Sequence, residues 1–460
     1  MSTPQEMVER ALELSKADGC IVIADETTSA NLRWANNTLT TNGVTQSRQL
    51  TVIATVGTGT GTAAGVVSRS GVDLDSLEAL VRSAEETARG SMLAEDAQPL
   101  IGPASSPTWS APPAETSMGV FASFAPELGA VFARARQEDR LLFGYAEHDM
   151  RTTYVGSSAG LRLRHDQPTG HVEINAKSAD LVRSAWVGAA TADFAGIDVD
   201  ALDADLVKRI GWAARSIDMP AGRYETIIPP GAVADLMLDL YWSADGRDAH
   251  EGRTVFSRAG GGTRLGERIS ELPVTLRSDP VAPGLEAEPF VIARASGGSQ
   301  SVFDNGLELK PTSWVTDGVL TALGQSRYTA QLTGMPVTPR MDNLIVEGAP
   351  GGRSLDEMVS ATERGLLLTC LWYIRVVDPQ TLLLTGLTRD GVYAIEQGEI
   401  VGSVNNFRFN ESPVDLLGRL SELGATVPTL PREMADYFTR IATPPMRVAD
   451  FNMSSVSQAS

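Results

Sequence analysis

The sequence predicts an α+β fold organised as two domains. A chain of 460 residues is longer than most single domains. Helical periodicity and strand-like alternation are mixed in the first half, whereas the second half consists mostly of short strands and turns. Two groups of helix breakers, at 220–222 and 229–231, bracket a short strand where this change occurs. We therefore predict an N-terminal domain of helices packed on a β-sheet (1–218) and a β-rich C-terminal domain (219–460).

The N-terminal domain opens with a clearly signalled helix. Thr3 is a typical N-cap, Pro4 suits the first helical position, and Glu6 completes a capping box. The pair Asn42 and Gly43 predicts a turn between two of the strands that follow. Those strands are expected at 20–24, 32–34 and 50–55.

The rest of this domain contains one proline-rich interruption. Five prolines between residues 94 and 117 exclude a regular helix, so we predict a surface loop there. The other expected elements are helices at 72–89, 125–136 and 204–216 and strands within 141–192.

Turn signals recur throughout the C-terminal domain. Pro230 and Gly231 predict the start of a helix. Glycine with aspartate, asparagine or glutamine predicts hairpin corners. These corners are expected at 303–306, 316–318, 389–391 and 397–398.

Composition indicates a globular protein that does not bind nucleic acid. Apolar residues make up 42% of the chain and charged residues 21%, which is enough to bury a full core. The net charge of −19 repels DNA phosphates, and no run of lysine or arginine overrides it.

The same features predict a cytoplasmic protein. The polar N-terminus does not have the basic and apolar regions of a signal peptide, and no apolar stretch approaches the ~20 residues that span a bilayer. We therefore predict no association with a membrane. Cys20 and Cys370 are expected to be buried, reduced thiols.

Two motifs that suggest chemistry are better explained as turns. Residues 156–160 match G-x-S-x-G, but a nucleophile elbow leads from a strand into a helix, and here the alternation of 161–165 predicts a strand. Residues 57–65 resemble a phosphate-binding loop, but a strand at 66–68 follows where a helix is needed. We predict a hairpin turn at both places.

The titratable residues form no recognisable catalytic arrangement. No H-E-x-x-H motif is present. Asp235 and Asp239 share a helix face, which on its own indicates a solvated acidic face. Cys370 lies among apolar residues, which favours a structural thiol over a nucleophile. The chain has four histidines, His148, His165, His171 and His250.

The order and spacing of several motifs resemble the TldD/PmbA family of metallopeptidases, also described as modulators of DNA gyrase. The resemblance is clearest from about 220 to 450 and implies a large curved sheet in the C-terminal domain. It is carried by Pro229-Pro230-Gly231 at the start of a helix and by the segments 303–306, 315–319, 339–343, 388–392, 398–402 and 405–409.

In the TldD branch of that family, a helix after the Pro-Gly turn carries H-E-x-x-x-H, which binds zinc and supplies the general base, and a C-terminal cysteine completes the site. Counted without gaps, the two histidine positions hold Asp235 and Leu240, and the glutamate position holds Leu236. No cysteine follows Cys370. Leucine can neither bind zinc nor act as a base. The chain is therefore similar to the TldE branch, which implies no catalytic residue and no metal in this chain.

The resemblance also implies partners. Zinc is expected in a TldD-like metallopeptidase subunit that pairs with this chain, and the substrate is expected to be a peptide or an unfolded protein. The sequence leaves self-association open when the partner is absent. The polar residues predicted to contact peptide or partner are Arg340, Asn343, Asn405 and Asn406.

The sequence leaves two alternatives open. The chain could be a zinc peptidase in its own right, with an unrecognised ligand set such as His165, His171 and an aspartate. It could instead be a binding or regulatory protein without a role in proteolysis.

Overall fold

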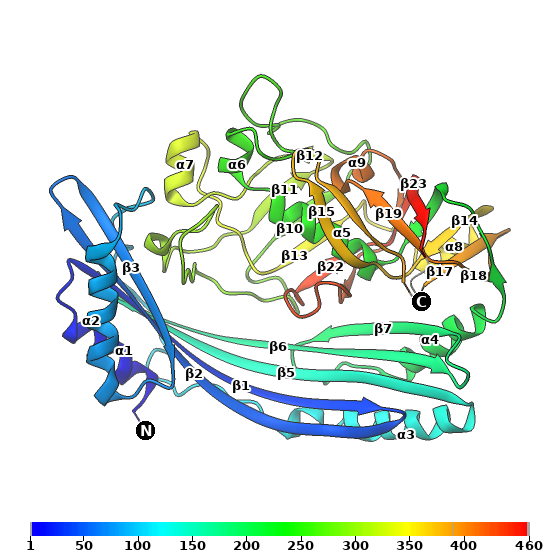
Figure 1. Cartoon of the computed structure of the whole chain (residues 1–460), viewed down its shortest axis with the longest axis horizontal. Helices are drawn as coiled ribbons and strands as arrows, with labels where there is room; N and C mark the ends of the chain where they lie inside the picture. Colours follow the sequence, from blue (N-terminus) through cyan, green and yellow to red (C-terminus); the bar gives the residue numbers. More distant parts are fainter. Residues whose placement is uncertain (1, 390, 458–460) are drawn as a thin grey trace.

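The computed structural model describes residues 2–389 and 391–457. Asp390, which lies in the corner expected at 389–391, falls outside the described residues. The N-terminal half is one curved sheet of long strands, and the C-terminal half sits against its concave side (Figure 1). This arrangement confirms the predicted α+β class, with helices on a sheet followed by a β-rich half.

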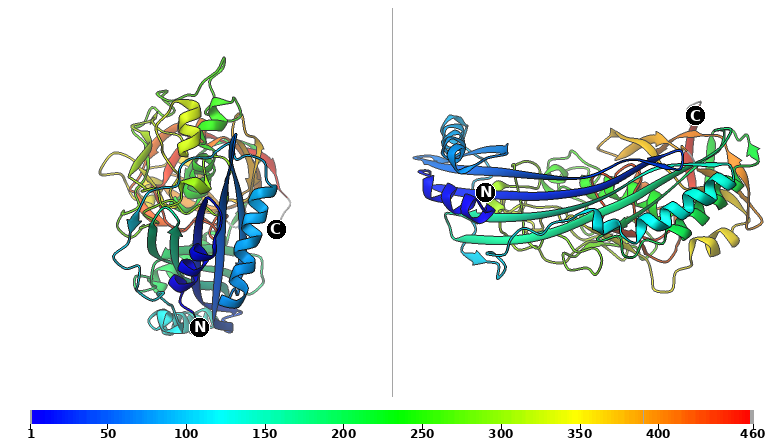
Figure 2. Two further views of the ribbon diagram at one scale, coloured as in Figure 1. Left: turned by 90° about the vertical axis from the view of Figure 1, so that its left-hand side faces the viewer. Right: turned by 90° about the horizontal axis from the view of Figure 1, so that it is seen from below.

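The N-terminal sheet has seven strands in the order β3-β2-β1-β5-β6-β4, and β7 pairs with β6. Four of its strands are 17 to 21 residues long, so the sheet spans the length of the molecule (Figure 2). Its strands are β1 (Gly19–Ala35), β2 (Thr38–Thr58), β3 (Gly61–Ser70), β4 (Ala104–Ser105), β5 (Arg140–Ser157), β6 (Leu161–Ser178) and β7 (Ser184–Thr191).

Helices cover this sheet at its two ends. One pair, α1 and α2, packs at one end, and α3 and α4 pack at the other (Figure 1). Capping boxes begin both α1, at Thr3, and α2, at Asp73. The helices are α1 (Pro4–Leu14), α2 (Leu74–Gly90), α3 (Phe124–Gln137) and α4 (Val199–Trp212), with a 3-10 turn η1 (Met118–Phe121) before α3.

The C-terminal half contains a ten-stranded sheet and a six-stranded sheet. The larger one follows the order β15-β16-β19-β23-β9-β14-β17-β18-β8, with β20 paired to β23. Its strands are β8 (Ser216–Ile217), β9 (Gly222–Ile228), β14 (Arg364–Leu368), β15 (Trp372–Asp378), β16 (Leu383–Leu387), β17 (Val392–Glu396), β18 (Glu399–Val404), β19 (Phe407–Glu411), β20 (Leu420–Leu423) and β23 (Met446–Val456).

The six-stranded sheet has the order β12-β11-β10-β13-β22-β21. Its strands are β10 (Thr275–Ser278), β11 (Thr312–Thr316), β12 (Val319–Leu320), β13 (Leu344–Glu347), β21 (Val427–Thr429) and β22 (Ile441–Thr443). Around the two sheets lie α5 (Pro230–Ser243), α6 (Gly246–His250), α7 (Arg327–Thr333), α8 (Leu355–Ser360), α9 (Pro413–Leu417) and the 3-10 turn η2 (Val302–Asp304).

Two predicted turns are wrong. The segment 303–306, expected to be a hairpin corner, includes the end of the 3-10 turn η2 and does not join two strands directly. Asn42 and Gly43 lie inside the continuous strand β2, and the chain reverses earlier, at Asn36 and Asn37. Both asparagines have positive φ, 50° and 58°, a region that asparagine tolerates better than most residues. The two glycine-rich motifs do form hairpin turns, between β2 and β3 and between β5 and β6.

Cys20 and Cys370 are both buried and are not joined by a disulfide. Burial raises the pKa of the Cys20 thiol to about 11. No helix in the described part of the chain is both long and apolar enough to cross a membrane.

Candidate functional site

The helix α5 lies at the centre of the C-terminal half. Pro230 occupies its first turn, and nearly all of its residues are buried, because it packs between the two sheets in one large apolar cluster. Leu236 and Leu240 are part of that cluster and are 0% and 1% exposed. These two positions therefore present no polar group to a solvent-filled site.

Asp235 is the first of two aspartates on this helix, and it is fully buried. Its carboxylate accepts hydrogen bonds from three consecutive backbone N–H groups, of Arg432 (3.2 Å), Glu433 (3.0 Å) and Met434 (3.3 Å). Burial raises the pKa of Asp235 well above its usual value, and the three N–H groups act in the opposite direction. Asp235 thus fixes the segment 432–434 against the helix.

The side chain of Arg432, the first residue of this segment, packs against two tryptophans. The Arg432 guanidinium lies over the rings of Trp186 (5.5 Å to the ring centroid) and Trp372 (4.8 Å), and it contacts the Cys370 sulfur. A guanidinium between two aromatic rings is held by both cation–π attraction and packing. Trp186 comes from β7, so this contact also ties the N-terminal sheet to the α5 region.

A second carboxylate lies one turn further along α5. Burial raises the pKa of Asp239 to about 7, and the charge of Glu433 adds to this effect while Arg375 opposes it. Glu433 itself accepts hydrogen bonds from the backbone of Tyr373 (3.0 Å) and from Arg375 (3.1 Å). Within residues 2–389 and 391–457, no group of three His, Cys, Asp or Glu side chains is placed to hold a metal ion.

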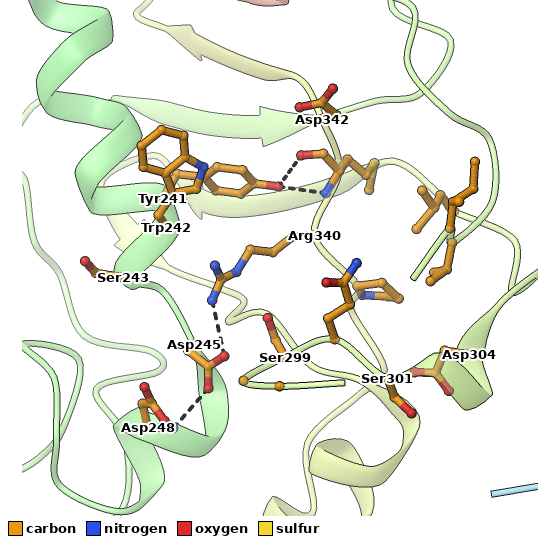
Figure 3. Close-up of a pocket in the computed structure, with 18 of the residues that line it drawn as sticks. Tyr241, Trp242, Ser243, Asp245, Asp248, Ser299, Ser301, Asp304, Arg340 and Asp342 are labelled. Carbon is orange, nitrogen blue, oxygen red and sulfur yellow. Dashed lines mark hydrogen bonds and ion pairs between the residues drawn. The ribbon is translucent and has the colours of Figure 1, made fainter. Parts of the chain in front are cut away.

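A cleft of about 620 Å³ opens at the C-terminal end of α5 (Figure 3). Arg340 points into it and forms an ion pair with Asp245 (3.2 Å). The Tyr241 hydroxyl at its edge donates to the Met341 carbonyl (2.9 Å) and accepts from the Met341 N–H (2.8 Å). Apolar residues (Trp242, Phe290, Ile292, Leu309 and Phe438) and acidic residues (Asp248, Glu288, Asp304 and Asp342) make up much of the remaining lining.

The cleft adjoins a second cavity of about 340 Å³ that reaches the N-terminal sheet. The two share Glu288, Asp342 and Phe438. The sheet contributes Asp149 and His171 to the second cavity, and His171 is buried with no hydrogen-bond partner on Nε2 among the described residues. Through these shared residues, the two cavities lie side by side, and the second one is lined by residues of both halves.

The predicted contact residues are spread over the molecule. Arg340 lines the cleft. Asn343 is fully buried, and its side chain holds the turn at Asp279 through the N–H and carbonyl of that residue. Asn405 accepts from the Met219 N–H (2.7 Å), and Asn406 lines a separate cavity of about 390 Å³. The structure brings only Arg340 into the cleft.

The alternative zinc set is not supported by geometry. His165 and His171 lie on the same strand, β6, six residues apart. That separation is about 20 Å along an extended strand, too far for two ligands of one ion.

Two sequence profiles of one family match most of the chain. The profile of the PmbA/TldA metallopeptidase C-terminal domain matches residues 221–455, and that of the family's domain 1 matches residues 20–88. The chain belongs to the PmbA/TldD metallopeptidase family. A search of curated proteins found no match.

Three solved structures share the fold of this PmbA/TldD family member. TldE from Thermococcus kodakarensis matches with a TM-score of 0.79 at 16% identity, over 97% of this chain and 99% of the other. A proposed modulator of a DNA gyrase from Thermotoga maritima has a TM-score of 0.75 at 16% identity, with the same coverage of both chains. Another from Bacteroides thetaiotaomicron has 0.72 at 15% identity, over 98% of each chain.

Several residues at this site were not predicted from the sequence. Arg432, Trp186 and Trp372 come from three distant segments, and no local motif marks any of them. Asp239 was visible on the predicted helix face, but that face was expected to be solvated, whereas the structure buries it.

Proposed function

We propose that this chain is a non-catalytic, TldE-like subunit of a cytoplasmic two-subunit peptidase and that a TldD-type partner supplies the zinc. The observation that carries the proposal is that the α5 residues at the family's zinc positions are buried or already hydrogen-bonded. Leu236 and Leu240 belong to the apolar core, and Asp235 accepts hydrogen bonds from three backbone N–H groups of the 432–434 segment.

The cleft and the cavity that adjoins it, taken together as a peptide passage between the two halves, give such a subunit a role in substrate binding. The apolar and acidic residues that line the cleft suit an extended peptide with apolar and basic side chains. Arg340 offers the opposite charge within the cleft, where its guanidinium is held by the ion pair with Asp245.

The proposal is tested by mixing this chain with a TldD-type protein that carries an intact H-E-x-x-x-H motif. We expect the chain alone to hold no stoichiometric zinc and to cleave no peptide. We expect the two proteins to co-elute as a complex that cleaves peptides faster than the TldD-type protein alone. Stoichiometric zinc with peptidase activity in the isolated chain would identify it as an enzyme instead. A failure to form a complex would favour a role outside proteolysis.

A variant of the cleft separates substrate binding from assembly. In the complex, Arg340→Gln is expected to raise KM for a peptide several-fold without changing the zinc content or the elution volume. The exposed Arg69→Gln, on β3 and far from the cleft, is the matched control. An unchanged KM for R340Q would remove the cleft from the proposal and leave the subunit role to the mixing experiment.

A further inference from the structure

Another large cavity, separate from the cleft and from the cavity that adjoins it, lies wholly within the C-terminal half and takes no part in the proposed peptide passage. It has a volume of about 600 Å³ and is bounded by β9, β19, β23, α9 and the loop 264–269. In Figure 1, α9 and β19 are drawn in the upper part of the molecule, whereas the N-terminal sheet forms the lower part. Four arginines line it, Arg223, Arg264, Arg268 and Arg419.

Two of these arginines use only some of their N–H donors in hydrogen bonds with the protein. Arg223 donates from Nη1 to the Asp450 carbonyl (3.1 Å), and Arg268 donates from Nη1 to the carbonyls of Ser270 (3.0 Å) and Asp317 (2.9 Å). Neither guanidinium forms an ion pair with a carboxylate of the described residues. A guanidinium has five N–H donors, so most of those on Arg223 and Arg268 face solvent.

The other two arginines are paired and well positioned. Arg264 forms an ion pair with Glu267 (2.9 Å), a carboxylate that also binds Arg258. Arg419 contacts the buried Glu411 and donates to the carbonyls of Ala449 and Asp450 (both 2.8 Å). These contacts fix the direction of each guanidinium fork before any ligand arrives.

The charge of this cavity is opposite to that of the protein as a whole. Its lining carries four arginines and two carboxylates, Glu411 and the exposed Asp415, and Glu267 pairs with Arg264 from outside the lining, so the arginines still outnumber the carboxylates in a chain of net charge −19. The amide-bearing side chains of Asn410 and Asn452 complete the polar wall. A chain that is acidic elsewhere and gathers four arginines around one hollow presents a local binding site for anions.

We propose that this cavity binds a small, multiply charged oxyanion, through phosphate or carboxylate groups. Guanidinium forks match both groups with paired N–H donors, and the volume lies within the range of small-ligand sites. The inference does not depend on the proposed peptidase role. A nucleic acid is a poorer candidate, because the rest of the acidic surface would repel its backbone.

The test is calorimetric titration of the intact chain at low salt with pyrophosphate and, separately, with citrate. At least one is expected to bind with a Kd below about 1 mM. The double variant Arg223→Gln with Arg268→Gln is expected to weaken that binding at least about tenfold. Binding of pyrophosphate alone identifies a phosphate ligand, and binding of citrate alone a carboxylate ligand.

The control matches the change in net charge. Arg33→Gln with Arg69→Gln removes two exposed arginines of the N-terminal sheet and is expected to leave binding unchanged. Urea unfolding of both double variants shows that each remains folded. Absence of binding by the wild-type chain, binding only of single-stranded DNA, or equal losses in the two double variants would overturn the proposal.

Discussion

At the scale of single residues, α5 holds two aspartates in different electrostatic settings. Asp235 is fully buried, but three N–H groups compensate its charge. Asp239 has no such compensation, because one carboxylate oxygen is buried without a hydrogen-bond partner in the described residues and Glu433 lies nearby. Ionising Asp239 therefore costs free energy in the folded state that the unfolded chain does not pay.

This difference predicts a pH dependence of stability. The pKa of Asp239 is raised to about 7 in the folded chain, so between about pH 4 and pH 7 the folded state holds a proton that the unfolded state has lost. The stabilisation is complete below pH 4 and is lost as the pH rises through 7, by at most about 1.4 kcal/mol per pH unit. Asp239→Asn is expected to remove the part of this slope that Asp239 contributes, so that the variant gains stability relative to wild type as the pH rises. The buried Asp235, whose pKa is also raised, keeps its own contribution in both proteins.

Urea unfolding from pH 4 to pH 8 measures this slope. Asp75→Asn, at an exposed position on α2, is the control and is expected to keep the wild-type profile. If the free energies of unfolding of D239N and wild type change in parallel from pH 4 to pH 8, Asp239 is ionised in the folded chain.

The sequence identified some of these residues and not others. Asp235, Leu236 and Leu240 were assigned correctly to one helix, because a Pro-Gly turn and a family motif fix the count. The contacts of Asp235 could not be predicted, since its partners lie about 200 residues further along the chain. The same is true of Arg432, whose position depends on two tryptophans from different sheets.

At the scale of elements, the N-terminal sheet depends on a glycine contact. Gly65 on β3 faces α2, and a Cβ atom at this position would overlap the backbone nitrogen of Ala88 and the backbone oxygen of Ala84. Backbone atoms cannot move aside as a flexible side chain can, so the helix lies on the strand only because residue 65 has no side chain.

Gly65→Ala is therefore expected to lower the free energy of unfolding by more than about 2 kcal/mol, because α2 must lift away from β3. Gly129→Ala is the matched control. Gly129 lies inside α3, and a Cβ atom there would meet no atom within 4 Å, so the change is expected to be neutral or to stabilise by up to about 1 kcal/mol. Equal stability of G65A and wild type in urea would show that α2 is loosely attached.

Local signals predicted most elements of the N-terminal half and fewer of the C-terminal half. Capping residues and apolar periodicity placed the main helices, although the helix expected at 204–216 runs from 199 to 212. Alternation placed strands within 141–192, but the strands expected at 20–24 and 32–34 are parts of one long strand, β1. The turn at Asn42 was wrong because a pair of asparagines at 36 and 37 makes the reversal, a weaker signal than Asn-Gly. In the C-terminal half, neighbouring strands such as β9 and β23 are far apart in sequence, so their pairing could not be predicted from local patterns.

At the scale of the whole molecule, the two halves share one apolar cluster. Ile21, Ile23 and Val155 of the N-terminal sheet pack with Phe290 and Phe303 of the C-terminal half. An ion pair reinforces the contact, since Arg294 binds Asp25 through two hydrogen bonds of 2.6 and 2.9 Å. Because the proposed peptide passage lies between the same two halves, its width would depend on this junction.

A shared core predicts that the halves unfold together. We expect one calorimetric transition for the wild-type chain. Phe303 is only 2% exposed, and Phe303→Ala is expected to cost about 3–5 kcal/mol at the junction and to split the transition into two. Phe409→Ala removes a buried ring from the C-terminal cluster alone and is expected to lower the transition temperature without splitting the transition. Two transitions in the wild-type chain would mean that each half is stable by itself and that the passage can open by separation of the halves.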